Sequence, residues 1–280
     1  MMKTMKLFDD NLDIFESKYI ELLDSIDSLS NPQYTFYIPS KGRANSTKTT
    51  KSLESFGIPF KLVVEPQDYS AYVTNFGEES VICMDKNDQG IYYVRQWIKD
   101  YSTSIGESHH WQLDDDLRYF RSHFDKRKRL TDGKIFTLVE QLTSEFTNIA
   151  QSGLTHFAFA FAKKRDYDFN KQVCSCMLIK NHTPAKFRPD IIEDTDFSLQ
   201  LLYAGLVTLN LNRFSYEGIP TMTQKGGNTE DFKEGKLHKR QLKLCEEYPA
   251  DFEVVIKDGR SRIKPSKVWS KFKTEPMRNT

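Results

Sequence analysis

The sequence predicts an α/β domain in which helices cover a parallel sheet. Segments with the apolar periods of strands and helices alternate four times between residues 34 and 113, which is typical of parallel sheets with helical connections. The chain has 280 residues, 38% of them hydrophobic and 28% charged. It can therefore bury a core and is not disordered by composition. Its length fits one large domain or two small ones.

Residues 1–33 are expected to form an amphipathic helix ahead of the main domain. Six apolar residues recur there at three- and four-residue steps, namely Leu12, Phe15, Tyr19, Leu22, Ile26 and Leu29. The pair Asn31 and Pro32 ends this pattern. We therefore divide the chain into an N-terminal helix (1–33), an α/β domain (34–250) and a basic C-terminal extension (251–280).

The main domain is expected to open with alternating strands and helices. We predict strands at 34–38, 61–64, 81–84 and 109–113, and helices at 47–56 and 91–101. A helix at 136–149 follows. In residues 155–162 phenylalanine alternates with alanine, which predicts a strand with bulky side chains on one face. A strand at 173–179 and a helix at 196–206 complete the domain.

The charges are balanced in total but uneven along the chain. There are 40 basic and 39 acidic residues, which argues against a protein that binds nucleic acid over its whole surface. Residues 118–134 nevertheless carry seven bases and two acids, and residues 251–280 carry eight bases and four acids. These zones permit one basic face, although solvated surface lysines explain each zone equally well.

Targeting signals and disulfides are not expected. The longest apolar run, residues 157–162, is far too short to span a bilayer. The first ten residues lack the apolar core of a signal peptide. Four cysteines in 280 residues do not make a disulfide framework. We therefore predict a soluble, cytoplasmic protein that does not bind membranes.

An acidic triplet, residues 114–116, directly follows the predicted strand at 109–113. In open parallel sheets, ligands bind beyond the carboxyl ends of the strands. Because side chains alternate along a strand, Asp114 and Asp116 can share a face and hold one Mg²⁺ or Mn²⁺ ion. Such a triplet alone is often a solvated turn, but its place after a buried strand favours a metal site.

A second acidic cluster, residues 193–196, stands directly before an apolar helix. One interpretation is capping, with Asp194 or Thr195 at the start of the helix and the acids near its positive end. The other is catalysis, because a carboxylate held at a helix terminus is well placed to act as a general base. The two interpretations are compatible.

The remaining motifs are weaker. Residues 40–43 offer a glycine, backbone amides and two cations, as a turn that binds a diphosphate would. Residues 225–228 are expected to form another flexible turn, and a plain loop explains them equally well. Cys174 and Cys176 lack a second pair at zinc-site spacing, so we expect buried strand cysteines. His109, His110 and His156 are expected to be structural, whereas His182 and His238 are better candidates as ligands.

Together these motifs resemble the GT-A glycosyltransferases. The shared features are a strand-exit turn, an Asp-x-Asp motif after the fourth strand and a later Glu-Asp pair that opens a helix. More narrowly, the sequence resembles the phage TET-associated glycosyltransferases over about residues 34 to 250. The residues that carry this likeness are YIPSKGR (37–43), VVEP (63–66), Gly90 with Arg95, QLDDD (112–116), EDTDF (193–197) and KGGN (225–228). The resemblance implies a mixed, mostly parallel sheet flanked by helices.

The resemblance also implies roles for individual residues. Asp116 would bind the metal with Asp114 beside it, and His238 could be a third ligand. Asp194 would be the catalytic base, with Glu193 and Asp196 as close rivals. The donor would be bound by Pro39, Ser40, Lys41, Arg43, Glu65, Asp85, Gly90, Arg95, Asp114, Asp115 and Gly227. The phosphates of DNA would be bound by Arg127, Lys128, Arg129, Arg260, Arg262 and Lys264.

The activity implied by the resemblance is transfer of glucose, or of a pentose such as arabinose, from a UDP-sugar to 5-hydroxymethylcytosine in phage DNA. The expected cofactor is Mn²⁺ or Mg²⁺, and the expected partner is double-stranded DNA in the host cytoplasm. Three other functions stay open. They are a GT-A enzyme that glycosylates a saccharide or protein, a nucleotidyltransferase, and a DNA-binding protein on a decayed transferase fold.

Overall fold

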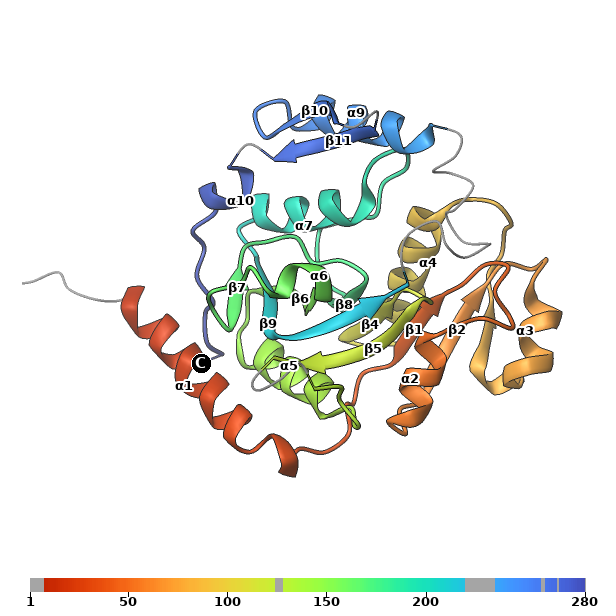
Figure 1. Cartoon of the computed structure of the whole chain (residues 1–280), viewed down its shortest axis with the longest axis horizontal. Coiled ribbons are helices and arrows are strands. Elements are labelled where there is room, and N and C mark those ends of the chain that lie inside the picture. Colours follow the sequence, from red (N-terminus) through yellow and green to blue (C-terminus); the bar gives the residue numbers. More distant parts are fainter. Residues whose placement is uncertain (1–7, 124–127, 220–234, 258–259, 266, 280) are drawn as a thin grey trace, which may run out of the picture.

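A mixed sheet forms the centre of the chain in the computed structural model, which describes residues 8–123, 128–219, 235–257, 260–265 and 267–279. Within these residues its strands are β1 (Phe36–Pro39), β2 (Phe60–Val64), β3 (Val81–Cys83), β4 (His109–Leu113), β5 (Leu117–Ser122), β6 (Ile149–His156), β7 (Tyr167–Phe169), β8 (Cys176–Lys180) and β9 (Val207–Gly218). They follow the order β3-β2-β1-β4-β8-β6-β9-β5, and β7 pairs with β9 (Figure 1).

The first four strands in sequence are parallel and form one half of the sheet. They are joined by α2 (Thr49–Ser55), α3 (Tyr69–Phe76) with the short helix η2 (Glu78–Ser80), and α4 (Ile91–Ser104). This confirms the predicted alternation, although α3 was not predicted. Because the strands are parallel, their carboxyl ends meet at one edge, where ligands bind in such sheets.

The other half of the sheet is mixed. β8 runs antiparallel to β4 and β6, whereas β6 and β9 are parallel, and β5 and β7 oppose β9. Six of the nine strands described in this sheet thus share one direction, namely β1, β2, β3, β4, β6 and β9. The predicted fold class, a mixed and mostly parallel sheet flanked by helices, is confirmed.

Aromatic residues fill the layer between the sheet and α5 (Lys134–Glu145). The ring of Phe36 stacks on Trp111 with centroids 5.4 Å apart, and Phe136 meets both rings edge-on. The buried carboxylate of Glu140 accepts hydrogen bonds from the Trp111 indole (2.9 Å) and from the backbone amide of Gln33 (2.8 Å). Glu140 therefore fixes the chain just before it enters β1.

The predicted N-terminal helix is present as α1 (Phe8–Asp24), followed by the 3-10 helix η1 (Ile26–Ser28). Its apolar face packs against the main domain rather than standing apart. Phe15 is fully buried, and its ring lies 4.7 to 5.3 Å from the rings of Phe146, Tyr167 and Phe169. Phe15 thus links α1 to the part of the core formed by α5 and β7.

We expect Phe15→Ala to lower the free energy of unfolding by about 3–5 kcal/mol, because it removes a fully buried ring and leaves a cavity. Ile20 on the same helix is 48% exposed, so Ile20→Ala serves as the matched control and should change stability by less than about 0.5 kcal/mol. Urea unfolding of both variants measures the difference. Equal small effects would show that α1 adds little to the stability of the domain.

Two sequence predictions are wrong next to β6. Residues 155–162 do not form a strand, because β6 ends at His156 and α6 (Phe157–Ala160) follows. The Nδ1 atom of His156 accepts the backbone N–H of Ala158 (3.1 Å) and so caps the short helix. The helix predicted at 136–149 ends at Glu145, and Ile149 already belongs to β6.

A small C-terminal unit packs on α7 (Glu193–Tyr203). It consists of α9 (Lys236–Glu247), the antiparallel hairpin of β10 (Phe252–Lys257) and β11 (Arg260–Pro265), and α10 (Val268–Lys271). Figure 1 shows the unit lying above α7, and a separate apolar cluster that includes Leu199, Leu244 and Phe252 joins the two. None of the helices described is long and apolar enough to cross a membrane.

Candidate active site

The carboxyl ends of β1, β2, β3 and β4 meet the start of α7 at one edge of the sheet. The loops that leave these strands contain most of the residues that the sequence singled out. Ion pairs and hydrogen bonds connect the side chains of these loops to one another and hold them in place at this edge.

The backbone of the acidic triplet is clamped against α2. The amide of Lys48 donates to the carbonyl of Asp115 (2.9 Å), and the Thr49 hydroxyl donates to the carbonyl of Asp114 (2.5 Å). The Thr49 hydroxyl in turn accepts the amide of Leu117 (2.9 Å). These bonds hold the turn between β4 and β5 in one conformation.

The three aspartates have different surroundings. The buried carboxylate of Asp115 accepts hydrogen bonds from the Ser40 hydroxyl (2.5 Å) and from the Arg43 guanidinium. Asp115 therefore braces the turn after β1 from inside. Asp114 and Asp116 are only partly buried, and Asp116 lies beside Gly218 at the end of β9. The two carboxylates that can reach a ligand are thus Asp114 and Asp116.

The cations of the turn after β1 are already paired within the protein. Lys41 Nζ lies 2.9 Å from the buried carboxylate of Glu65 and also contacts Asp88, and Arg43 is paired with Asp115. Glu65 accepts the backbone amide of Asp88 as well (3.0 Å). These contacts connect the loops that follow β1, β2 and β3. Glu65 therefore stabilises the arrangement of the three loops.

Gly90 and Asp85 shape the loop between β3 and α4. Gly90 begins α4 with a φ angle of 84°, in the left-handed region that favours glycine. The Asp85 carboxylate is exposed and accepts the Tyr93 hydroxyl (2.8 Å). This loop thus brings a carboxylate and an aromatic hydroxyl to the same edge as the acidic triplet.

Arg95 joins the two acidic clusters. Its guanidinium is 4% exposed, lies 2.7 Å from Asp114 Oδ1 and 3.5 Å from Glu193 Oε1, and so bridges the end of β4 to the start of α7. Among the residues described, its Nε and Nη1 atoms have no hydrogen-bond acceptor. A buried arginine with donors to spare is a site where an anionic or carbonyl group of a ligand would be stabilised.

Crowding of acids raises the pKa of several carboxyl groups at this edge. Burial and the nearby Asp114 and Asp115 raise the pKa of Asp116 to about 7. Burial and the neighbouring Asp194 raise the pKa of Glu193 to about 7, against the opposing effect of Arg95. Burial also raises the pKa of Asp194. Perturbed carboxyl groups in a shared cluster are typical of functional sites.

Because folding raises the pKa of Glu193 from 4.5 to about 7, the folded state binds this proton more tightly than the unfolded chain. The resulting stabilisation is complete below pH 4.5 and is lost as the pH rises through about 7. We expect the free energy of unfolding, measured without metal by urea titration, to fall across this range. Glu193→Gln should flatten that slope, and an unchanged slope would contradict the assignment.

Asp196 lies outside this cluster. Its side chain is fully buried, and its carboxylate accepts hydrogen bonds from Arg188 Nε (2.8 Å) and Nη2 (2.5 Å), Gln200 (2.8 Å) and the Tyr248 hydroxyl (2.7 Å). Asp196 therefore anchors α7 to the loop before it and to the residue that follows α9. The candidate bases at this edge are Glu193 and Asp194.

The predicted cap of α7 is wrong in detail. The helix begins at Glu193 rather than 196, its N-cap is Ile192, and no side chain caps it. Glu193, Asp194 and Asp196 instead lie in the first turn of the helix, where the positive end of the helix dipole favours negative charge. The carboxylate of Asp194 accepts the amide of Thr195 (2.6 Å).

Sequence patterns missed two residues beside Asp194. Cys174 precedes β8 rather than lying in it, and its thiol lies 3.3 Å from the Tyr216 hydroxyl of β9. Burial raises the pKa of Cys174 to about 12, and the charges of Asp194 and Asp114 add to this effect. Nothing in the local sequence signals this pair, because the sheet brings the two residues together from 42 positions apart.

The model of the TET-associated glycosyltransferase family matches residues 34–227, more than half of the chain. The chain belongs to this family. It is therefore a glycosyltransferase, and the matched segment contains β1 to β9 together with both acidic clusters. No curated protein matches this glycosyltransferase.

Two solved structures that are similar to the glycosyltransferase share little sequence with it. One is described as a nucleotide-diphospho-sugar transferase from Desulfovibrio desulfuricans G20, with 10% identity and a TM-score of 0.39 over 79% of this chain and 99% of that one. Another is a mannose-6-phosphate isomerase from Helicobacter pylori, with 8% identity and a TM-score of 0.27 over 89% and 94%. Likeness at this level decides neither fold nor function.

No contact that the structure describes connects the other predicted binding residues to this edge of the sheet. His238 is exposed on α9, and its Nδ1 atom lies 2.8 Å from the Ser261 hydroxyl of β11. Within the described ranges, no three His, Cys, Asp or Glu side chains are grouped to hold a metal ion. Gly227 and Arg127 lie outside the described residues, as does the Arg260 side chain.

The other predicted DNA contacts lie on two surfaces. Arg129 stacks on the Tyr119 ring of β5 at 3.5 Å, and Lys128 is exposed next to it. Arg262 and Lys264 are exposed on β11, where Lys264 pairs with Glu253 (2.6 Å). The first of these surfaces lies along β5, the strand that begins directly after Asp116.

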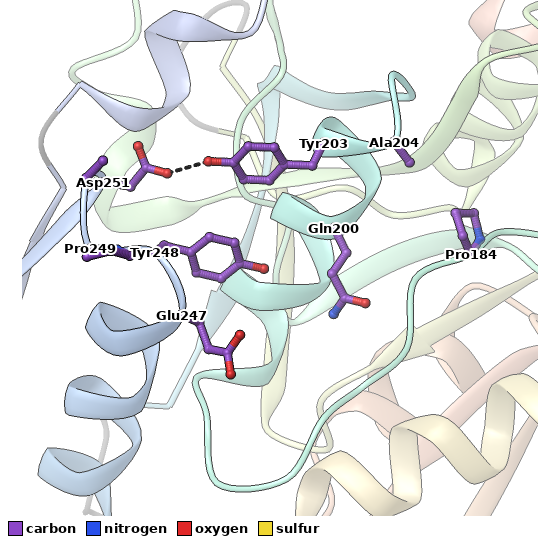
Figure 2. A pocket seen from close by; sticks show the side chains of 9 residues that line it. Pro184, Gln200, Tyr203, Ala204, Glu247, Tyr248, Pro249 and Asp251 are labelled. Carbon is purple, nitrogen blue, oxygen red and sulfur yellow. Dashed lines mark hydrogen bonds between the residues drawn. The ribbon is translucent and has the colours of Figure 1, made fainter.

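A hollow of about 590 Å³ lies on the other side of α7 and contains none of the site carboxylates. Tyr203, Tyr248 and Asp251 line it together with Gln200 (Figure 2). The Tyr203 hydroxyl donates to Asp251 (2.7 Å), and the rings of Tyr203 and Tyr248 stack. This hollow belongs to the joint between α7 and the C-terminal unit rather than to the acidic edge.

Proposed function

We propose that this glycosyltransferase moves a sugar from a UDP-sugar to the hydroxymethyl group of 5-hydroxymethylcytosine in double-stranded DNA, with Mn²⁺ or Mg²⁺ bound. The observation that carries the proposal is the cluster of Asp114, Arg95, Glu193 and Asp194 at the carboxyl edge of the sheet. The family match supports glycosyl transfer, and the basic surface on β5 supports a DNA acceptor.

The donor set fits a hard divalent cation. Asp114 and Asp116 supply carboxylate oxygens, and the raised pKa of Asp116 reflects crowded negative charge that a cation would relieve. Mg²⁺ usually takes one or two protein carboxylates and fills its other positions with water and substrate phosphates, so a third protein ligand is not required. When bound, the ion would neutralise charge on the departing diphosphate.

Arg95 and Asp194 carry the chemistry of the protein itself. Arg95 holds Asp114 in place, and its unpaired Nη1 donor is available to an oxygen of the donor. In an inverting transfer, the hydroxymethyl oxygen forms a bond to the anomeric carbon while the bond from that carbon to the diphosphate oxygen breaks. The hydroxyl proton passes to the Asp194 carboxylate, and the nucleoside diphosphate leaves with the bonding electrons.

The acceptor would approach along β5. Arg118, Arg121 and Arg129 surround Tyr119, and the chain runs directly from Asp116 into this strand. Arginines there can neutralise phosphates without reading sequence. Lys128 next to them, and Arg262 and Lys264 on the hairpin, are the further phosphate contacts that we propose.

The test is nucleoside diphosphate release with Mn²⁺ across a panel of UDP-sugars, with duplexes that contain either 5-hydroxymethylcytosine or cytosine. The proposal expects release only with the modified duplex and one donor, and loss of release in Asp116→Ala. Release that ignores DNA would favour a saccharide or protein acceptor. Release of pyrophosphate would identify a nucleotidyltransferase instead.

A further inference from the structure

The segment that was predicted as a strand, residues 155–162, instead presents aromatic side chains to solvent. Phe159 is 66% exposed and Phe161 is 47% exposed, although both are large apolar residues. The half-buried ring of Phe157 lies 5.1 Å from Phe161 and supports it. We call these three residues the aromatic wedge. Exposed aromatic side chains gathered in one place mark an interaction surface.

The aromatic wedge lies at the catalytic edge of the sheet. β6, which leads into it, runs in the same direction as β4, with only β8 between them. The register pairs Leu113 of β4 with Cys176, and Met177 with Gly153 of β6. Adjacent strands are about 4.8 Å apart, so the exit of β6 lies about 10 Å from the exit of β4 at Asp114.

Side-chain contacts connect the wedge to the acidic cluster. The ring of His156 lies 5.6 Å from Phe159 and meets Tyr216 edge-on at 5.2 Å. The Tyr216 hydroxyl contacts the Cys174 thiol, which is close enough to Asp194 and Asp114 to feel their charge. Three side-chain contacts thus lead from the wedge to Cys174, whose thiol lies near the proposed base Asp194.

Positive charge surrounds the wedge. Arg121 lies over the Phe157 ring at 4.9 Å, and the guanidinium groups of Arg118 and Arg129 lie over the ring of Tyr119, which Arg121 also approaches. Of these arginines, Arg118 and Arg121 share one acidic partner, Glu217. Three guanidinium groups gathered around these rings complement a phosphate backbone rather than an apolar partner.

We propose that the aromatic wedge enters the base stack of the acceptor duplex, with Phe159 occupying the space left when the target nucleotide turns out towards Asp194. This inference rests on the proposed function. Turning a base out of a duplex costs unpairing and unstacking energy, and apolar side chains inserted between base steps offset that cost in proteins that deform DNA. Arg118, Arg121 and Arg129 hold the flanking phosphates.

The test compares Phe159→Ala with the parent enzyme on two acceptors that contain 5-hydroxymethylcytosine, a duplex and the corresponding single strand. Phe159→Ala should lower transfer into the duplex by about 5- to 150-fold, the range that follows from losing one base–aromatic stacking contact. Transfer into the single strand should stay within about twofold, because no stack has to be opened. Ile105→Ala, which removes an exposed side chain at the end of α4 (54% exposed), is the matched control.

A direct readout is the fluorescence of 2-aminopurine placed next to the target cytosine, which rises when that base loses its stacking partner. The parent enzyme and Ile105→Ala should raise it, and Phe159→Ala should not. Unchanged duplex transfer in Phe159→Ala, or equal losses on both acceptors, would overturn the wedge and leave the proposed function intact. Failure of the parent enzyme to modify or unstack any DNA would overturn the proposed function, and the wedge with it.

Discussion

Asp194→Asn is expected to lower glycosyl transfer by about 10²- to 10⁴-fold, the contribution of a positioned general base. Asparagine keeps the shape of the side chain and can still accept the amide of Thr195, so the start of α7 should stay folded. The affinity for UDP in the presence of Mn²⁺, measured by titration calorimetry, should equal that of the parent enzyme. The substitution would then lower the rate of transfer and not the binding of the nucleotide.

Asp190→Asn provides the matched control for this prediction. Asp190 is exposed in the loop before α7 and has a φ angle of 57°, a conformation that asparagine adopts readily. Its activity should equal that of the parent enzyme. If Glu193→Gln were inactive and Asp194→Asn active, the base would be Glu193, and two active variants would remove both carboxylates from the mechanism.

Arg95→Met is expected to lower the free energy of unfolding by about 1–3 kcal/mol, because it removes a buried guanidinium that pairs with two partly buried carboxylates. The variant leaves Asp114 and Glu193 without their shared cation. Since the ionised form of Glu193 depends on that cation, the deficit should shrink as the pH is lowered and Glu193 becomes protonated. Denaturant unfolding at several pH values measures it.

The exposed Lys51 of α2 offers a control in which a helical cation is replaced without loss of a buried pair. Lys51→Met should change stability by less than about 0.5 kcal/mol. Arg95→Lys should recover part of the stability but little of the transfer, because an ammonium cannot present the planar fork of the guanidinium. A deficit in Arg95→Met that does not depend on pH would show that packing, not charge, is what Arg95 supplies.

Local pattern predicted much of the fold. β4 was located to the residue, and α4 was found over most of its length, because each has a strong apolar period and a clear boundary. β5 was missed because Arg118 and Arg121 interrupt its apolar residues, and its pairing with β9 comes from a distant part of the chain. The aromatic segment after β6 was predicted wrongly because the alternation of phenylalanine and alanine also fits a short helix.

The sequence predicted which motifs belong to the candidate site, but not how their side chains are arranged in space. The sequence placed acids after a strand and before a helix, and these segments do meet through Arg95. Their bridge depends on the packing of α4 against the sheet, which spacing along the chain does not reveal. The same limit explains why Asp196, adjacent to the candidate bases in sequence, is instead enclosed by Arg188, Gln200 and Tyr248.

The paired state of Lys41 and Arg43 changes the expected picture of donor binding. Both were predicted to face the phosphates, yet Lys41 contacts Glu65 and Asp88, and Arg43 contacts Asp115. These pairs connect the loops that surround the acidic triplet. The Nη1 atom of Arg95 has no hydrogen-bond acceptor among the described residues, which makes Arg95 a candidate for contact with the donor.

The central claim is that this glycosyltransferase adds a sugar to a hydroxyl group of DNA. The most direct measurement is mass spectrometry of nucleosides digested from a 5-hydroxymethylcytosine duplex after incubation with the enzyme, Mn²⁺ and UDP-sugars. We expect a nucleoside heavier by one sugar residue, present with the parent enzyme and absent with Asp194→Asn. Unaltered nucleosides, together with donor turnover onto water or a saccharide, would contradict it.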